Sequence, residues 1–152
     1  MTTTFLPVTP AVPVVRTDFS DPAAWDEVQS GITWVSPDGF EADVTFVDDP
    51  AFAGLTADEL LDRLPGDCEH VLLLVVDETA ISSPEHPVLV VDLEETAGPG
   101  VRVFRAVPHT VQDFEANLRI ANVDWEDYAD SVDDDGVLRS HLVYGRLEDL
   151  PE

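Results

Sequence analysis

The chain has 152 residues, with 32 Asp or Glu and 7 Lys or Arg, so its formal net charge at pH 7 is −25. All seven basic residues are arginine, and lysine is absent. This charge repels nucleic acid and anionic membranes, which excludes direct binding to either, and it attracts cations and basic proteins. The length predicts one domain, and no apolar run reaches the roughly 18 residues of a transmembrane helix. Solubility, or adaptation to a salty background, is an alternative cause of the charge.

The N-terminus predicts an extended or frayed arm over residues 1–11, ahead of a single globular domain over residues 12–152. This arm lacks the basic segment of a secretory signal. The chain has one cysteine, Cys68, which excludes an internal disulfide and suits a reducing compartment. Together these features predict a cytoplasmic location.

The first regular elements are a strand from Val12 to Asp18 and a helix after it. Asp21 is the expected N-cap of this helix, and Pro22 occupies its first position, where proline is favoured. Gly31 marks the end of the helix. Capping therefore explains Asp21 more simply than ligand binding does.

A second strand and a second helix follow. From Glu41 to Asp48 the apolar residues alternate loosely, which predicts a half-exposed strand. Thr56 and Glu59 then form a capping box, in which each side chain accepts a hydrogen bond from the backbone N–H of the other residue. The Pro-Gly pair at residues 65–66 ends this helix.

Two apolar runs, from Val71 to Val76 and from Val88 to Val91, form the centre of the chain. Neither run alternates and both have the length of a strand, so we expect buried strands that are covered on both faces. Between them lies a polar segment with two prolines, which we expect to be a loop. Loops held by a rigid core often carry sites, although a solvated connection is the alternative. The candidate residues in this loop are Asp77, Glu78, Glu85 and His86.

The C-terminal part predicts one more strand and two helices. The strand runs from Val101 to Val107 and places Arg102 and Arg105 on opposite faces, so one of them is expected near a sheet edge or beside an acid. A helix begins at Thr110, with apolar residues three and four positions apart. Another begins at Asp124, its expected N-cap, and ends in an acidic turn.

These elements predict an α/β or α+β fold, with a mixed sheet of about five strands and helices packed on it. The strands that begin at Val71 and Val88 would be central, and the final pair of helices would lie on one face. Residues 137–138 form a short strand or pack the chain back onto the domain. We find no internal repeat and no linker between domains.

Several stretches of this sequence resemble one protein family. They are VVRTDFSDPAAWDEV, VDDPAFAGLTADELL, DETAISSPEHPVLVVDL and NLRIANVDWEDYADSVDDDGVLR. The chain resembles, over roughly residues 12–139, an actinobacterial family of small acidic proteins, common in streptomycetes and filed as a domain of unknown function. The resemblance implies a bacterial cytoplasmic origin and brings no activity with it.

Three aspartates follow predicted strands: Asp18, Asp48 and Asp77. If these strands are parallel neighbours, the carboxylates meet at one edge of the sheet, where they could hold a hard cation such as Mg²⁺. A receiver-type phosphoacceptor is disfavoured because that chemistry uses a lysine, which this chain lacks. Capping and turn roles are the alternative for most of these aspartates.

Other motifs for chemistry are absent or incomplete. Residues 131–136 match the start of a calcium-binding loop, but its twelfth position is Leu142 where a bidentate Glu is required. Neither a phosphate-binding glycine loop nor a G-x-S-x-G sequence is present. His86 is the histidine that we would test as a base, and a surface position is its alternative. We expect no cofactor and favour a protein that is not an enzyme.

Acidic residues fill seven of the twelve positions from 124 to 135. Acids attract a basic partner over distance, and aromatic side chains anchor interfaces. We therefore expect this surface to bind a basic protein, as immunity and antitoxin-like proteins do, although its two aromatic residues could instead belong to the core. The candidate residues are Asp124, Trp125, Glu126, Asp127, Tyr128, Asp130, Asp133, Asp134 and Asp135.

Three alternatives stay open at this point. Acids spaced along a helix could imitate DNA phosphates and inhibit a nucleic-acid-binding protein. A metal-dependent domain could form around Asp18, Asp48, Asp77 and His86. The acidic helix could also be simply a solvated face. The sequence leaves the partner, the oligomeric state and the strand order open.

Overall fold

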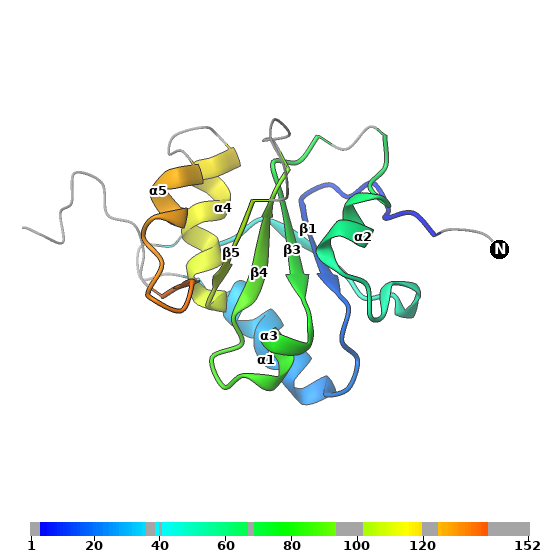
Figure 1. Cartoon of the computed structure of the whole chain (residues 1–152), viewed down its shortest axis with the longest axis horizontal. Coiled ribbons are helices and arrows are strands. Elements are labelled where there is room, and N and C mark those ends of the chain that lie inside the picture. The colour runs from blue at the N-terminus through cyan, green and yellow to red at the C-terminus, as the bar shows by residue number, and fades with distance from the viewer. Residues whose placement is uncertain are drawn as a thin grey trace, which may run out of the picture.

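A mixed sheet forms the centre of the molecule (Figure 1). The computed structural model describes residues 4–35, 39, 41–66, 69–93, 102–119 and 125–139. Within these residues the strands are β1 (Val12–Arg16), β2 (Val44–Val47), β3 (Leu72–Val76), β4 (Val88–Asp92), β5 (Val103–Ala106) and β6 (Val137–Leu138). Their order across the sheet is β2-β1-β3-β4-β5-β6. β2, β1 and β3 run parallel, β4 is antiparallel to β3 and β5, and β6 is parallel to β5.

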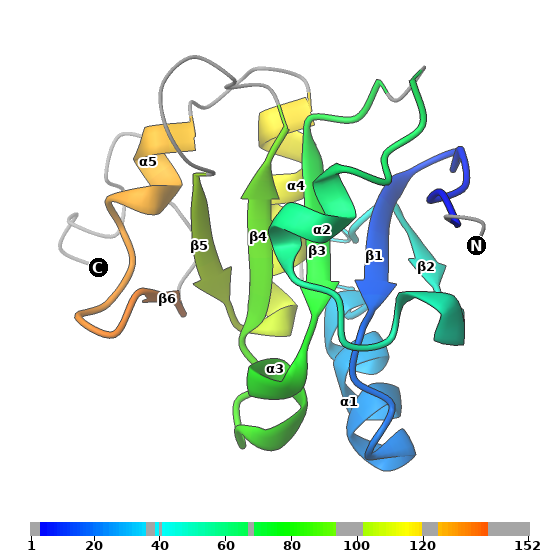
Figure 2. The same ribbon diagram turned by 45° about the vertical axis from the view of Figure 1, so that its right-hand side comes forward.

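Helices cover both faces of the sheet. They are α1 (Pro22–Ile32), α2 (Ala57–Leu61), α3 (Glu78–Ser82), α4 (Val111–Arg119) and α5 (Trp125–Ala129), with 3₁₀ turns η1 (Pro50–Phe52) and η2 (Pro108–Thr110). Figure 2 shows α2 in front of the sheet and α1 and α4 behind it. The predicted fold class is confirmed, and β3 and β4 hold the predicted central positions.

The two faces of β3 pack into two separate cores. Leu72, Leu74 and Val76 belong to the core that includes α1, α4 and α5. Leu73 and Val75 belong to the smaller core beneath α2 and η1. All five side chains of β3 are buried, as the unbroken apolar run predicts.

The predicted helix starts are confirmed at α1 and α2. The Asp21 carboxylate accepts hydrogen bonds from the backbone N–H groups of Ala23 and Ala24, at 3.1 and 3.2 Å. Thr56 and Glu59 form the reciprocal capping box of α2. These interactions are local, so they could be predicted without knowledge of the fold.

The polar segment between β3 and β4 is not wholly a loop, because α3 occupies its first half. Asp77 is the N-cap of α3, and its carboxylate accepts a hydrogen bond from the backbone N–H of Ala80 at 3.1 Å. A helix of five residues is too short to show helical periodicity in a sequence, which is why the prediction was wrong here.

Other boundaries differ by a few residues. β2 begins at Val44 rather than Glu41. The predicted helix at Thr110 starts as the 3₁₀ turn η2 and continues as α4, while α5 ends at Ala129, before the acidic turn. The short strand at residues 137–138 is confirmed as β6. The strand start at Val101 and the N-cap at Asp124 lie outside the described residues.

The N-terminal segment from residue 4 to residue 11 has no regular structure but is attached to the domain. Leu6 is buried, and its backbone N–H donates to the carbonyl of Arg63 at 2.7 Å. Thr9 is also buried, and its hydroxyl lies 3.2 Å from Nε2 of His70. None of the helices in the described ranges is long and apolar enough to cross a membrane.

Candidate functional site

Arg139 is the centre of an ion-pair cluster that joins distant parts of the chain. Its guanidinium donates to Glu85 at 2.9 Å, to Asp133 at 2.8 Å and to Asp135 at 2.7 Å. Glu85 precedes β4, whereas the two aspartates lie in the turn before β6. The cluster, which we call the Arg139 cluster (Glu85, Asp133, Asp135 and Arg139), therefore brings two predicted candidate regions together.

Hydrogen bonding within the Arg139 cluster changes the proton affinity of its members. The Arg139 guanidinium lowers the pKa of Glu85 and of Asp135 below their ordinary values. In return, hydrogen bonds to Asp135, Glu85 and Asp133 raise the pKa of Arg139. Three carboxylates around one guanidinium leave an excess of negative charge, so the cluster still attracts cations.

Two concave surfaces adjoin the Arg139 cluster. A cleft of about 400 Å³ is lined by Thr79, Ser83, Pro84, Glu85, Pro87, Arg105, Asp135, Val137 and Arg139. A groove of about 250 Å³ is lined by Glu85, Val107, Pro108, His109 and Arg139. Both hollows combine apolar walls with carboxylates, which is the composition expected of a site for a cationic group with an apolar neighbour.

The other sheet arginines also contact carboxylates. Arg16 donates to Asp48 at 3.1 Å. Arg105 binds both carboxylate oxygens of Asp77, at 2.7 and 3.0 Å. Arg102 pairs with the buried Asp92 and with Glu126, and its hydrogen bond lowers the pKa of Glu126. The prediction that an arginine of this strand meets an acid thus holds for both.

The two aromatic residues of the predicted binding surface are in the core. Trp125 is 8 % exposed and Tyr128 is 0 % exposed. The Trp125 ring lies 4.8 Å from that of Phe104, and the Tyr128 ring lies 5.9 Å from that of Phe114. They stabilise α5 against the sheet and cannot anchor a partner, because the face of α5 that they occupy is turned inward. The structure therefore agrees with the alternative that both aromatic residues belong to the core.

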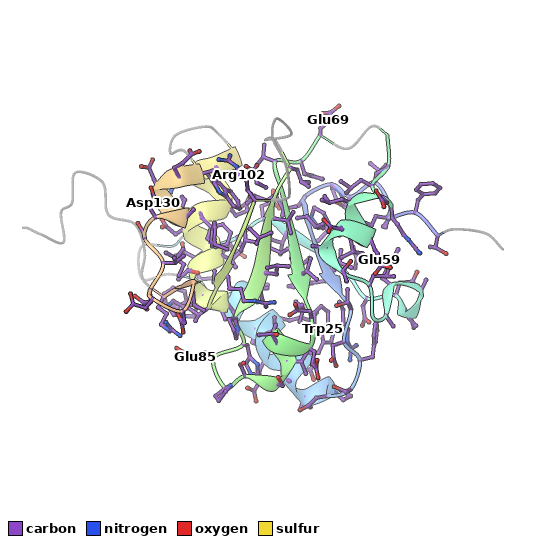
Figure 3. The ribbon with its side chains drawn as sticks, in the orientation of Figure 1. Trp25, Glu59, Glu69, Glu85, Arg102 and Asp130 are labelled. Carbon is purple, nitrogen blue, oxygen red and sulfur yellow. The ribbon has the colours of Figure 1, made fainter. Side chains whose placement is uncertain are left out.

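All six acids that the structure describes on this surface are exposed, and three of them form ion pairs with arginines. Glu126 is bound to Arg102, and Asp133 and Asp135 are bound to Arg139. Asp127, Asp130 and Asp134 are exposed. Figure 3 shows Asp130 beside α5, with Glu59 and Glu69 on other sides of the molecule. Negative charge therefore surrounds the domain rather than covering one face.

The three aspartates of the metal hypothesis lie at one edge of the sheet, but each of them forms hydrogen bonds or an ion pair with a different partner. β1, β2 and β3 are parallel neighbours, as that hypothesis requires. However, Asp18 accepts hydrogen bonds from Ser20, Asp48 pairs with Arg16, and Asp77 pairs with Arg105. In the ranges that the structure describes, no three His, Cys, Asp or Glu side chains are placed to hold a metal ion.

His86 and Glu78 have structural surroundings. Nδ1 of His86 lies 2.9 Å from the carbonyl oxygen of Ala80, and Nε2 lies 3.0 Å from Glu27 Oε1. His86 also has a positive φ of 53°, which is uncommon for a non-glycine residue. Both ring nitrogens thus lie within hydrogen-bonding distance of oxygens of α3 and α1. Glu78 is exposed in the first turn of α3.

The structure also brings together two aromatic residues that the sequence did not single out. Trp34, just after α1, is 39 % exposed, and its ring centroid lies 5.8 Å from that of His109 in η2. Gly31 packs against Pro108 beneath them. The stretch around Trp34 has an ambiguous pattern, and no sequence signal connects it with residue 109.

Comparison with known proteins places the chain in a family without an assigned activity. No curated protein and no solved structure matches it. The family called DUF6924, a domain of unknown function, matches residues 11–141, which include every strand and helix described above. The chain therefore belongs to the DUF6924 family.

Proposed function

We propose that this protein is a non-enzymatic interaction protein that binds a basic protein, in the manner of immunity and antitoxin-like proteins. The observation that supports this proposal is the pairing of Arg16, Arg102, Arg105 and Arg139 with carboxylates of the same chain. The positive charges of these four arginines are neutralised locally. The remaining acids then give a negative field that attracts a basic protein and raises its rate of association.

The side of the molecule formed by α5 and the Arg139 cluster is the proposed contact surface. Asp130 and Asp134 are exposed there, next to a cluster that itself carries excess negative charge. The actinobacterial origin and cytoplasmic location that the family resemblance implies are parts of the same proposal. The partner would then be a cytoplasmic protein with a basic surface.

A pull-down with matched charge variants tests this proposal. The tagged protein is mixed with a lysate of its source organism at low and at physiological salt, and retained proteins are identified by mass spectrometry. We expect one basic protein to remain bound at physiological salt. The double variant Asp130→Asn with Asp134→Asn should weaken its retention.

The control removes the same charge elsewhere. Asp62 and Glu69 are exposed, and Figure 3 shows Glu69 far from Asp130. The variant Asp62→Asn with Glu69→Gln should retain the partner like the wild type. If both variants lose the partner equally, the contact surface is not at α5. If nothing is retained above background, the proposal is wrong.

A DNA-mimic inhibitor is the second candidate, and the burial of Trp125 and Tyr128 favours it. Without these rings, the exposed residues from 126 to 135 are acids apart from Ser131, which is closer to an array of phosphates. The partner would then be a nucleic-acid-binding protein. Its affinity should fall steeply and linearly on a log–log plot against salt concentration, because many ionic contacts are lost together. DNA should displace the protein from such a partner.

A further inference from the structure

Negative charge on all sides of a protein attracts basic partners but does not discriminate between them. Selection requires a site where an exposed side chain meets a partner in a fixed geometry, and exposed aromatic residues commonly provide it. Of the Phe, Tyr and Trp side chains that the structure describes, Phe5 and Trp34 are the exposed ones. Phe5 lies in the irregular N-terminal segment, whereas Trp34 follows directly on α1.

The surroundings of Trp34 hold it in place. Its backbone N–H donates to the carbonyl of Gly31 at 3.3 Å, and the nearby Ile32 is fully buried. Gly31 packs so closely on Pro108 that a Cβ there would lie 2.6 Å from Pro108 Cβ. These contacts fix the backbone that carries Trp34, and a preorganised backbone lowers the entropy lost on binding, so Trp34 is suited to be an anchor.

Trp34 contacts a second ring, and that ring lines a groove that also contains a carboxylate. Its ring meets that of His109 at 5.8 Å and an interplanar angle of 81°. His109 in turn lines the groove of about 250 Å³ together with Glu85 and Arg139. The groove is therefore lined by the His109 ring, against which Trp34 packs, and by Glu85 and Arg139 of the Arg139 cluster, which carries excess negative charge.

The protein holds two of its own arginines in just such surroundings. The guanidinium carbon of Arg16 lies 4.3 Å from the ring centroid of Phe19 and 5.1 Å from that of Trp25, while Asp48 accepts its hydrogen bond. A similar pairing holds Arg102, which lies 5.6 Å from the Trp125 ring and is bound to Asp92 and Glu126. In this fold, an aromatic ring with a carboxylate beside it thus binds a guanidinium group.

We infer that the groove lined by His109, Glu85 and Arg139, with Trp34 packed against His109 at its side, receives an arginine side chain of the basic partner. This inference rests on the proposed function and names the chemistry by which the partner is recognised. A planar guanidinium can stack on Trp34 and still donate hydrogen bonds to a carboxylate. A lysine ammonium is more strongly hydrated and lacks this planar shape. The groove should therefore prefer arginine to lysine at equal charge.

Two fluorescein-labelled peptides of equal charge test this preference, one of six arginines and one of six lysines. Their dissociation constants are measured by fluorescence anisotropy at about 0.15 M NaCl. We expect the wild type to bind the arginine peptide about five-fold more tightly, which is typical of one cation–π contact. Trp34→Ala should reduce the ratio to near one, and Trp34→Phe should restore part of it.

Phe5→Ala is the matched control, because it removes the other exposed aromatic ring and should leave the ratio unchanged. Circular dichroism confirms that each variant is folded. Equal affinities of the two peptides for the wild type, or a ratio unaffected by Trp34→Ala, would overturn this inference and leave the proposed function standing. Absence of binding by either peptide, even at low salt, would overturn both.

Discussion

Arg105 connects three segments through a single side chain. Its guanidinium binds both oxygens of Asp77 and donates to the carbonyl of Pro87 at 2.9 Å. The same Asp77 carboxylate also caps the N-terminus of α3. Both side chains are only about a quarter exposed, so their ion pair is screened less than one on the surface. The Arg105–Asp77 ion pair therefore holds α3, β5 and the start of β4 together.

Two substitutions of Asp77 separate capping from charge. Asp77→Asn keeps an oxygen that can cap α3 but loses the ion pair, so we expect the free energy of unfolding to fall by about 1 kcal/mol. Asp77→Ala loses both interactions and should cost about 2 kcal/mol. Urea denaturation measures both values. Equal losses in the two variants would show that capping contributes nothing.

Gly31 of α1 packs closely against Pro108 of η2. A methyl group at this position would lie 2.6 Å from Cβ of Pro108, and a proline ring cannot rotate away. We expect Gly31→Ala to lower the free energy of unfolding by about 1–2 kcal/mol, despite the better helix propensity of alanine.

Gly66→Ala is the control for Gly31→Ala, because no atom lies within 4 Å of the position that a Cβ would occupy there. Its effect should stay within about 0.5 kcal/mol. Urea denaturation of the two variants side by side gives the comparison. If the two variants have the same free energy of unfolding, α1 and η2 can move apart to accept the methyl group without a loss of stability.

At the scale of elements, β6 is short, and its two buried side chains, its pairing with β5 and the Arg139 cluster all hold it. It has two residues and pairs with β5 through Arg105 and Ala106. The Arg139 cluster adds a connection from the end of this strand to Glu85 and to the preceding turn. Attachment of the C-terminal part of the described domain therefore depends on ionised carboxylates.

This dependence predicts a pH effect with a definite sign. Arg139 lowers the pKa of Glu85 and Asp135 from ordinary values of 4.5 and 3.8 in the folded state. Their stabilising contribution is therefore present above these values and is lost as the pH falls through the lowered pKa. Arg139→Gln should lower the melting temperature at pH 7, and this difference from the wild type should shrink below about pH 4.

Arg63→Gln is the matched control for Arg139→Gln, because it removes the same charge while Arg63 donates to a backbone carbonyl, that of Thr4. Its difference from the wild type should not shrink at low pH in the same way. Thermal unfolding followed by circular dichroism from pH 7 to pH 3 provides both curves. Parallel curves for the two variants would contradict the assigned role of Glu85 and Asp135.

At the scale of the whole molecule, the net charge of −25 opposes folding. The acids labelled in Figure 3 lie on several sides, so folding brings many like charges within one Debye length of each other. The neutralised arginines reduce this repulsion locally but leave most of it. Salt should therefore stabilise the protein, although it weakens individual ion pairs.

The melting temperature should rise by several degrees as NaCl increases from about 0.01 to 0.3 M, over which the screening length falls from about 30 Å to below 10 Å. A variant with Asp62→Asn, Glu69→Gln, Asp130→Asn and Asp134→Asn should show a smaller rise. Differential scanning calorimetry measures both. A fall in melting temperature with salt would mean that the ion pairs of the arginines outweigh the general repulsion.

Local chemistry determined much of this fold. The caps at Asp21 and Thr56 and the unbroken apolar run of β3 depend on residues close in sequence, and all appear as predicted. α3 was missed because one and a half turns of helix contain too few residues for a periodic pattern. The sequence predicted a helix that carries Trp125 and Tyr128, but not whether these rings meet the sheet or a partner.

By itself, the sequence determined the fold class, the central strands and the excess of negative charge, because composition, caps and apolar runs act over a few residues. Only the tertiary structure decided the strand order and the ion-pair partners. Arg139 and Glu85 are 54 residues apart, and Trp34 meets His109 across the domain. Such contacts depend on which strands and helices become neighbours, and that is set by packing of the whole chain rather than by any local pattern.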